Sequence, residues 1–236
     1  MKKTNKNLML YLPHNKLSDK IWEDEDTLIP EVRDALMKIA DEFIDYLGVD
    51  IDVLDITMTG SLANYNYTPY SDIDLHIMID TSSVNKDIDL VEEFFNAKKS
   101  FWNDRHDITI KGVEVELYPQ DINEEHSSTG VYSVQEEEWV IKPDKFKSKF
   151  DKESVSRKAN VLKKEIQIAI SNSIKDIDVE PLDKMIKKLK KFRTSGLARS
   201  GELADENIAY KIIRDAGLLQ KLFDTKYKIK DEQLSI

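Results

Sequence analysis

The chain has 236 residues, of which 40% are hydrophobic and 34% charged, and its formal charge is −10. These values are typical of a soluble globular protein with one large domain or two small ones, and the acidity argues against a protein that coats nucleic acid nonspecifically. The absence of cysteine excludes disulfides, thiolate zinc sites and cysteine nucleophiles. No apolar run approaches the roughly 20 residues that cross a bilayer, and no signal peptide is visible, so cytoplasmic residence is expected.

The first part of the chain predicts a short arm and then a helix. Residues 1–6 are basic and polar, and residues 7–12 predict an arm or a first β segment. Apolar residues then recur at helical spacing over 32–47, behind Pro30, which suits a first helical turn, and ahead of Gly48, which suits a C-terminal cap. This pattern predicts a structural helix that packs on the back of a sheet.

Two strands joined by a polar loop follow this helix. Residues 53–58 predict the first strand, and residues 72–79 predict the second. Because side chains alternate along a strand, Asp72, Asp74 and His76 share one face, and the apolar residues between them take the other. One face of the second strand is therefore expected to be buried, and the opposite face to present two close carboxylates.

The loop between the strands opens with Gly60 and Ser61. A glycine lets the backbone approach a phosphate closely, and a serine adds a hydroxyl and an amide donor. The carboxylates of Asp72 and Asp74 can hold Mg²⁺, a hard cation that binds carboxylates together with substrate phosphates. These residues predict a metal-dependent nucleotide site, in which Ser71, next to the first aspartate, is a further candidate for nucleotide binding.

The motif resembles the signature of the DNA polymerase β-like nucleotidyltransferase superfamily: Gly60-Ser61, ten intervening residues, and Asp72-Ile73-Asp74 within Ser-Asp-Ile-Asp-Leu. The resemblance implies an α+β fold with a mixed-sheet, polymerase β-like palm domain. It also implies that Gly60 and Ser61 hold a triphosphate, and that Asp72 and Asp74 hold two Mg²⁺ ions, with Mn²⁺ as an alternative. A third acidic residue is expected on a later strand.

A helix and a further strand region follow the motif. Residues 90–102 predict the helix, with Asp87 or Ser83 as its cap. Residues 108–118 alternate between apolar and polar side chains, which predicts one strand, or two strands hinged at Lys111-Gly112.

Glu114 and Glu116 fall on one face of this strand region. Glu116 is the expected third carboxylate because it lies deeper in the strand, and Glu114 is the alternative. Many members of the superfamily have aspartate at this point, but the longer glutamate can reach the same metal. A hairpin is then predicted over residues 131–141.

After the hairpin, the pattern is helical only. Apolar stripes over residues 155–170, 182–192 and 203–216 predict three amphipathic helices that pack as a small bundle. We therefore expect two domains, a nucleotidyltransferase domain over residues 1–148 and a helical C-terminal domain over residues 149–236.

Basic residues cluster in the second of these helices and just beyond it, with only Asp183 opposing them in that stretch: Lys184, Lys187, Lys188, Lys190, Lys191, Arg193 and Arg199. Part of this cluster is expected to meet the phosphates of an NTP or of nucleic acid, with Arg193 and the later Lys211 as nucleotide-binding candidates. The alternative is a solvated helix face. Residues 192–207 also resemble, less specifically, a C-terminal segment of phage-encoded predicted nucleotidyltransferases.

These features predict a Mg²⁺-dependent enzyme that moves a nucleoside monophosphate from an NTP, such as ATP, to an acceptor hydroxyl and releases pyrophosphate. Asp72, Asp74 and Glu116 are its catalytic and metal-binding candidates. The basic helical domain favours RNA, a tRNA end or a nucleotide as acceptor, with a protein side chain or a small molecule also open. The alternatives are a catalytically silent nucleotide-binding or toxin-neutralising protein on the same fold, and a purely structural interaction protein.

Overall fold

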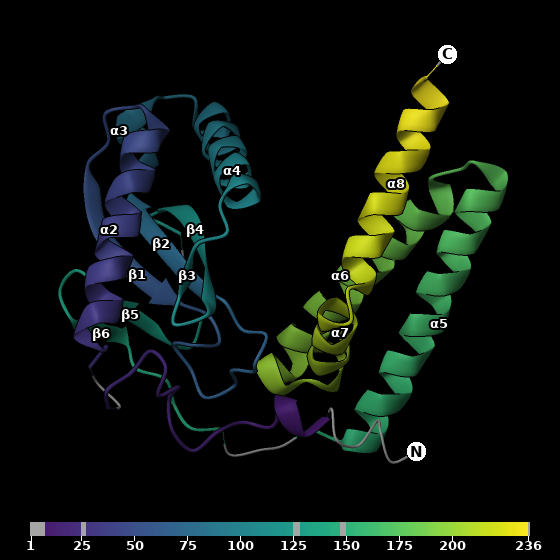
Figure 1. Cartoon of the computed structure of the whole chain (residues 1–236), viewed down its shortest axis with the longest axis horizontal. Coiled ribbons are helices and arrows are strands. Elements are labelled where there is room, and N and C mark those ends of the chain that lie inside the picture. Colours follow the sequence, from purple (N-terminus) through teal and green to yellow (C-terminus); the bar gives the residue numbers. More distant parts are fainter. Residues whose placement is uncertain (1–7, 25–26, 125–127, 147–149, 236) are drawn as a thin grey trace. The chain divides into compact units, whose positions relative to one another are not determined.

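The structure is a computed structural model that describes residues 8–24, 27–124, 128–146 and 150–235. The chain divides into two compact units. We call Pro13–Phe146 the sheet unit, and Met1–Leu12 together with Lys147–Ile236 the helical unit. Figure 1 shows strands and helices in the first and helices in the second. The domain boundary expected at residues 148 and 149 stays a prediction.

The sheet unit is built on a six-stranded sheet with the order β3-β4-β2-β1-β5-β6. β1 runs antiparallel to β2 and to β5, whereas β2 runs parallel to β4. This mixed sheet confirms the expected α+β class. Its strands are β1 (Val53–Thr59), β2 (Ile73–Ile79), β3 (Thr109–Ile110), β4 (Val113–Asp121), β5 (Val131–Ser133) and β6 (Glu138–Ile141).

The alternation of side chains gives the central strands one buried face. Ile73, Leu75 and Ile77 of β2 are fully buried, and Val115 and Leu117 of β4 join the same core. The residues between them, which include Asp74 and His76, lie on the opposite and partly exposed face of β2. The predicted split of this strand into a buried and a polar face is confirmed.

Two long helices cover the buried face. α2 (Pro30–Leu47) and α4 (Ile88–Arg105) contribute apolar side chains to the core, and the rings of Phe43 and Trp102 meet edge to face at 5.4 Å. Gly48 ends α2 in a left-handed conformation, as its position predicts. A short helix, α3 (Thr81–Val84), precedes α4.

Local geometry decides which residue caps α4 and whether residues 108–118 form one strand or two. The side chain of Asp87, not that of Ser83, caps α4 by accepting from the backbone N–H of Leu90. Lys111 and Gly112 both have positive φ angles, 50° and 74°. They form the turn that separates β3 from β4, so residues 108–118 make two antiparallel strands and not one.

The helical unit consists of four α-helices and two short 3₁₀ helices in its described part. They are η1 (Met9–Tyr11), α5 (Lys152–Asp176), α6 (Glu180–Ser200), η2 (Gly201–Leu203), α7 (Asp205–Asp215) and α8 (Leu218–Leu234). Leu162, Ile166, Leu182, Leu189 and Leu222 are buried together between the four longer helices. No helix in the described ranges is long and apolar enough to cross a membrane.

Two sequence expectations for this unit are wrong. The pattern predicts three helices, but α8 is a fourth; only Leu222 and Ile229 of it are buried, so its apolar stripe is too sparse to stand out. The alternative of a first β segment over residues 7–12 is also wrong for its described part, where η1 forms. The Tyr11 hydroxyl there donates to Asp215 Oδ2 at 2.7 Å.

Glu206 links three helices of this unit through ion pairs. Its carboxylate lies 2.8 Å from Lys158 Nζ of α5 and 2.5 Å from the Arg199 guanidinium of α6. Burial acts to raise the pKa of Glu206, but the two cations outweigh that effect and lower the pKa from 4.5 to about 2. Because the pKa in the folded state is depressed, the stabilisation is complete above the unfolded value and disappears as the pH falls toward 2.

We therefore expect the free energy of unfolding of the helical unit to fall between pH 4.5 and pH 2. The substitution Glu206→Gln should lower it by about 1–3 kcal/mol at pH 7 and flatten its pH dependence in this window. Circular dichroism at 222 nm follows the helices during denaturation of the full chain. Glu232→Gln, on the exposed side of α8, is the matched control. An equal pH dependence in the Glu206→Gln variant and the unmodified chain would contradict this account.

Candidate active site

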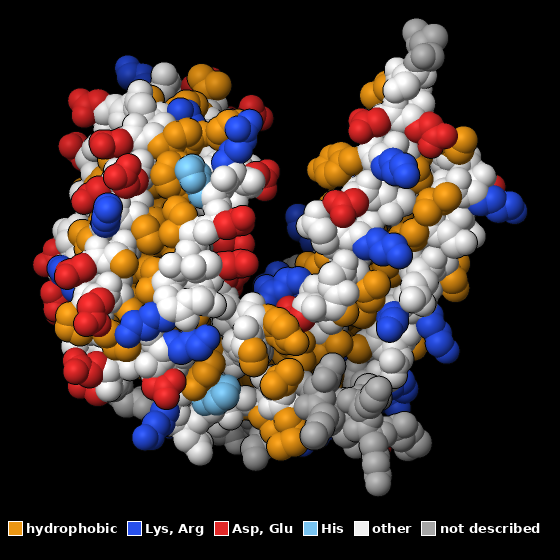
Figure 2. Space-filling view, in the orientation of Figure 1, with side chains coloured by type: hydrophobic (Ala, Val, Ile, Leu, Met, Phe, Trp, Pro, Cys, Tyr) orange, Lys and Arg blue, Asp and Glu red, His pale blue; other side chains and the backbone are white. Residues whose placement is uncertain are grey.

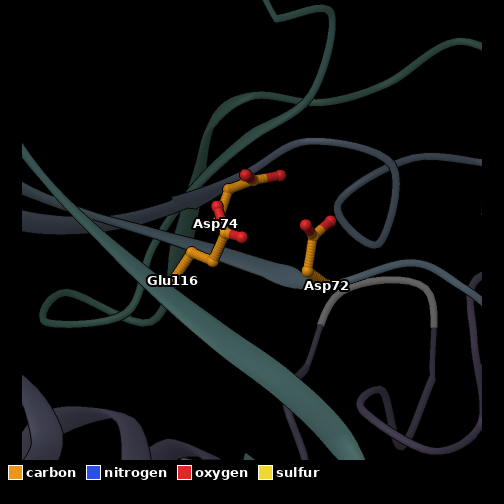
Figure 3. A group of neighbouring side chains, drawn as sticks. All are labelled: Asp72, Asp74 and Glu116. Atoms are coloured by element: carbon orange, nitrogen blue, oxygen red, sulfur yellow. The ribbon is translucent and has the colours of Figure 1, made fainter. Parts of the chain in front are cut away.

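Three carboxylates converge where β2 begins beside β4. Asp72 immediately precedes β2, Asp74 is its second residue, and Glu116 lies directly opposite Asp74 on β4. One carboxylate oxygen from each of the three lies within 4.8 Å of the others. Figure 3 shows the three side chains directed toward one shared space.

The strand register distinguishes the two candidate glutamates. Glu116 is partly buried and lies opposite Asp74, whereas Glu114 is exposed and lies opposite Thr109 of β3. Both share one face of β4, but the group of three contains Glu116. The structure thus brings the preferred third carboxylate, and not its alternative, to the two aspartates.

The donor set fits a divalent cation. Carboxylate oxygens are hard ligands, and three partly buried side chains can surround one shared space. Without a cation, three carboxylates at this separation would repel one another. Asp72, Asp74 and Glu116 are therefore the residues that would hold the metal.

Gly60 brings the turn after β1 against this site. It directly follows Thr59, the β1 residue that pairs with Asp74. Its φ of 76° favours glycine, and a Cβ atom at this position would lie only 1.8 Å from Asp74 Oδ2. A glycine is thus required both by the backbone conformation and by the closeness of the Asp74 carboxylate.

The loop after Gly60 returns to the site through two serines. The Ser61 and Ser71 hydroxyls are 2.7 Å apart. The Thr68 backbone N–H donates to Ser71 Oγ at 2.9 Å, and the Ser71 N–H donates to the Thr68 carbonyl at 3.1 Å. The loop is further held by Trp22 Nε1, which donates to the Leu62 carbonyl at 2.8 Å. These bonds hold Ser61 beside Ser71, the residue that directly precedes Asp72.

Tyr118 is a site residue that the sequence analysis missed. Its hydroxyl donates to Glu116 Oε2. Burial raises the pKa of Tyr118, and the hydrogen bond to Glu116 and the charges of Glu116, Asp74 and Asp72 raise it further. The phenol therefore remains a donor that fixes the Glu116 carboxylate. The sequence signal was its spacing: Tyr118 follows Glu116 by two positions and so shares its strand face.

His76 supports Tyr118 and does not itself belong to the carboxylate group. The two rings stack with centroids 5.0 Å apart, and His76 Nε2 lies 3.0 Å from Thr59 Oγ1. These three residues border a cleft of about 350 Å³, which α4 closes on another side with Asn96 and Lys99. Tyr118 connects this cleft to Glu116, which does not itself line it.

The two basic candidates for nucleotide binding, Arg193 and Lys211, belong to the helical unit. Lys211 Nζ forms an ion pair with Glu202 at 3.1 Å, and the Arg193 guanidinium lies 5.1 Å from the centroid of the Tyr210 ring. Their binding of nucleotide stays a prediction. Several other residues of the basic cluster are paired with acids of the helical unit: Lys184 with Glu180, Lys188 with Glu165 and Arg199 with Glu206.

Comparison with known proteins gives one match. No curated protein and no solved structure matches the chain. The family model of the nucleotidyltransferase domain matches residues 36–195, which include β1, β2, β4 and the three carboxylates, and this match confirms the resemblance seen in the motif. The chain therefore belongs to the nucleotidyltransferase domain family, of the polymerase β-like type.

Proposed function

We propose that the sheet unit transfers a nucleoside monophosphate from an NTP to an acceptor hydroxyl and releases pyrophosphate. The observation that carries this proposal is the convergence of Asp72, Asp74 and Glu116 beside the Gly60-Ser61 turn, in a chain of this family. A catalytically silent protein would not need all three carboxylates. Their joint retention supports an enzyme over a binding partner.

The residues divide into two groups by role. Asp72, Asp74 and Glu116 would hold Mg²⁺, with Mn²⁺ as an alternative, and the bound ions would neutralise phosphate charge and lower the pKa of the acceptor hydroxyl. Ser61 and the backbone amides after Gly60 would donate hydrogen bonds to the β- and γ-phosphates. Tyr118 occupies Glu116 Oε2 and leaves Oε1 for the metal or for the incoming hydroxyl.

The transfer step is a substitution at the α-phosphorus. The acceptor oxygen forms a bond to the α-phosphorus, while the bond from that phosphorus to the oxygen that bridges the α- and β-phosphates breaks. Pyrophosphate leaves with the electron pair of the broken bond. Glu116 would accept the proton of the acceptor hydroxyl, which then passes to water.

The distribution of charge favours RNA as the acceptor. The sheet unit contains 31 Asp and Glu against 11 Lys and Arg, a formal charge of −20, and the helical unit contains 14 against 24, a formal charge of +10. Figure 2 shows acidic side chains over α2 and basic side chains along α5, whereas α8 carries side chains of both signs. A polyanion would be repelled by the sheet unit and attracted to the helical unit.

The test is incubation of the full chain with each α-³²P-labelled NTP and Mg²⁺, together with total RNA, cell protein or no acceptor. We expect label in RNA and an equal amount of released pyrophosphate. Label in protein or in a small product would move the acceptor to that class and keep the reaction. Mg²⁺-dependent NTP binding without label in any product would contradict the proposed transfer and favour the silent binding protein.

A further inference from the structure

A groove of about 410 Å³ opens between α6, α7 and α8 within the helical unit. Apolar and aromatic side chains form its walls, among them Leu197, Tyr210, Leu219 and Phe223. Two cations, Lys190 and Arg193, border it. The combination of aromatic walls with cations suits a ligand that is both planar and anionic.

Arg193 has hydrogen-bonding capacity that the described part of the chain leaves unused. Its Nε is buried and meets no acceptor among the described residues. Its guanidinium lies over the Tyr210 ring. The nearby carboxylate of Glu202 is paired with Lys211 at 3.1 Å, and the charge of Arg193 adds to that of Lys211 in lowering the pKa of Glu202. An arginine in this position can bind an anionic ligand without first breaking an ion pair of its own.

The positive charge of the helical unit favours a chain of phosphates over a single carboxylate as the anion. Lys190 is exposed on α6, and Lys187 and Lys191 of the same helix are exposed as well. Within the described residues these three lysines have no ion pair. With a formal charge of +10 on the unit, a chain of phosphates gains more from this surface than a single carboxylate does.

We propose that this groove binds one nucleotide of a single-stranded RNA acceptor. The base would pack against Tyr210 and Phe223, and its phosphate would lie between Arg193 and Lys190. Stacking on aromatic side chains together with a basic rim is the general means of binding single strands without sequence preference. The inference rests on the proposed transfer to RNA, and it supplies the RNA contact that the acidic sheet unit cannot.

The test is fluorescence anisotropy of a fluorescein-labelled, single-stranded 12-nucleotide RNA titrated with the full chain. We expect Arg193→Gln to weaken binding at least about 10-fold, because a charge-assisted contact is lost from a partly buried site. Tyr210→Leu, which keeps the apolar volume, should weaken it about 5- to 10-fold through loss of stacking. Lys187→Gln removes the same charge from α6 outside the groove and should change the affinity less than about 3-fold.

Circular dichroism at 222 nm checks that each variant is folded. Equal losses for Arg193→Gln and Lys187→Gln would overturn the groove and leave only a diffuse basic surface. No binding of the RNA at low salt, or binding of an acidic peptide in its place, would overturn the RNA assignment.

The labelling assay separates this inference from the proposed function. RNA binding that depends on Arg193, without transfer of label, would contradict the transfer reaction and support the groove. Transfer of label to RNA that is equally efficient in the Arg193→Gln variant would contradict the groove alone.

Discussion

Replacing Asp74 with asparagine is expected to abolish transfer of label from NTP while leaving the sheet unit folded. Asparagine keeps the size of the side chain but removes one of three charges that lie within 4.8 Å of one another. Loss of a single electrostatic contact in an active site costs about 10²–10³ in rate. Asp74 would contact both the metal and, through it, the phosphates, so we expect a loss of at least about 10³-fold.

The initial rate of label transfer measures this effect. Glu114→Gln is the matched control, since it removes the same charge from the exposed end of the same strand face. We expect its rate to stay within about 3-fold of the unmodified chain, as for a surface charge. Asp72→Asn should behave like Asp74→Asn. A tenth or more of the original rate in the Asp74→Asn chain would exclude Asp74 from the metal site.

The free energy of unfolding of the Asp74→Asn chain is expected to rise slightly. Three carboxylates without a cation repel one another, so removal of one charge relieves repulsion in the metal-free protein. Trp22, Trp102 and Trp139 all lie in the sheet unit, so tryptophan emission during denaturation follows this unit. A folded but inactive variant then separates loss of chemistry from loss of structure.

The sequence predicted most of the site because its signals are local. Alternation along residues 72–77 is enough to place Asp72 and Asp74 on one face, and the Gly60-Ser61 turn is recognisable from its own residues. Alternation alone does not distinguish Glu114 from Glu116, because both occupy one face of β4. The pairing of Asp74 with Glu116 decides it, and strand pairing is a non-local property.

Contacts between residues distant in sequence also explain some of the features that the sequence did not predict. The basic cluster in α6 has few acids near it in sequence, but Glu165 of α5 and Glu206 of α7 pair with two of its members in the fold. The hydrogen bond from Tyr118 to Glu116 depends on side-chain rotamers that no spacing reveals. The α8 helix has too few buried residues for a clear period.

Replacing Gly60 with alanine is the second change with a large expected effect. Alanine at a φ of 76° costs about 1 kcal/mol of stability. Its Cβ would also lie 1.8 Å from Asp74 Oδ2, so the carboxylate or the turn must move. Because a displacement of about 1 Å in an active site can cost 10²-fold in rate, we expect transfer of label to fall by at least about that factor.

Gly112→Ala provides a control that isolates the collision from the backbone strain. Gly112 has nearly the same φ, 74°, but a Cβ there would meet no atom within 4 Å. Both variants should therefore lose about 1 kcal/mol for the left-handed conformation, read from tryptophan emission during denaturation. Gly60→Ala alone should lose activity, and it should also need more Mg²⁺ for half-maximal transfer because Asp74 is displaced. If the two variants lost activity equally, backbone strain would explain the loss, and the close approach of Gly60 to Asp74 would have no part in the site.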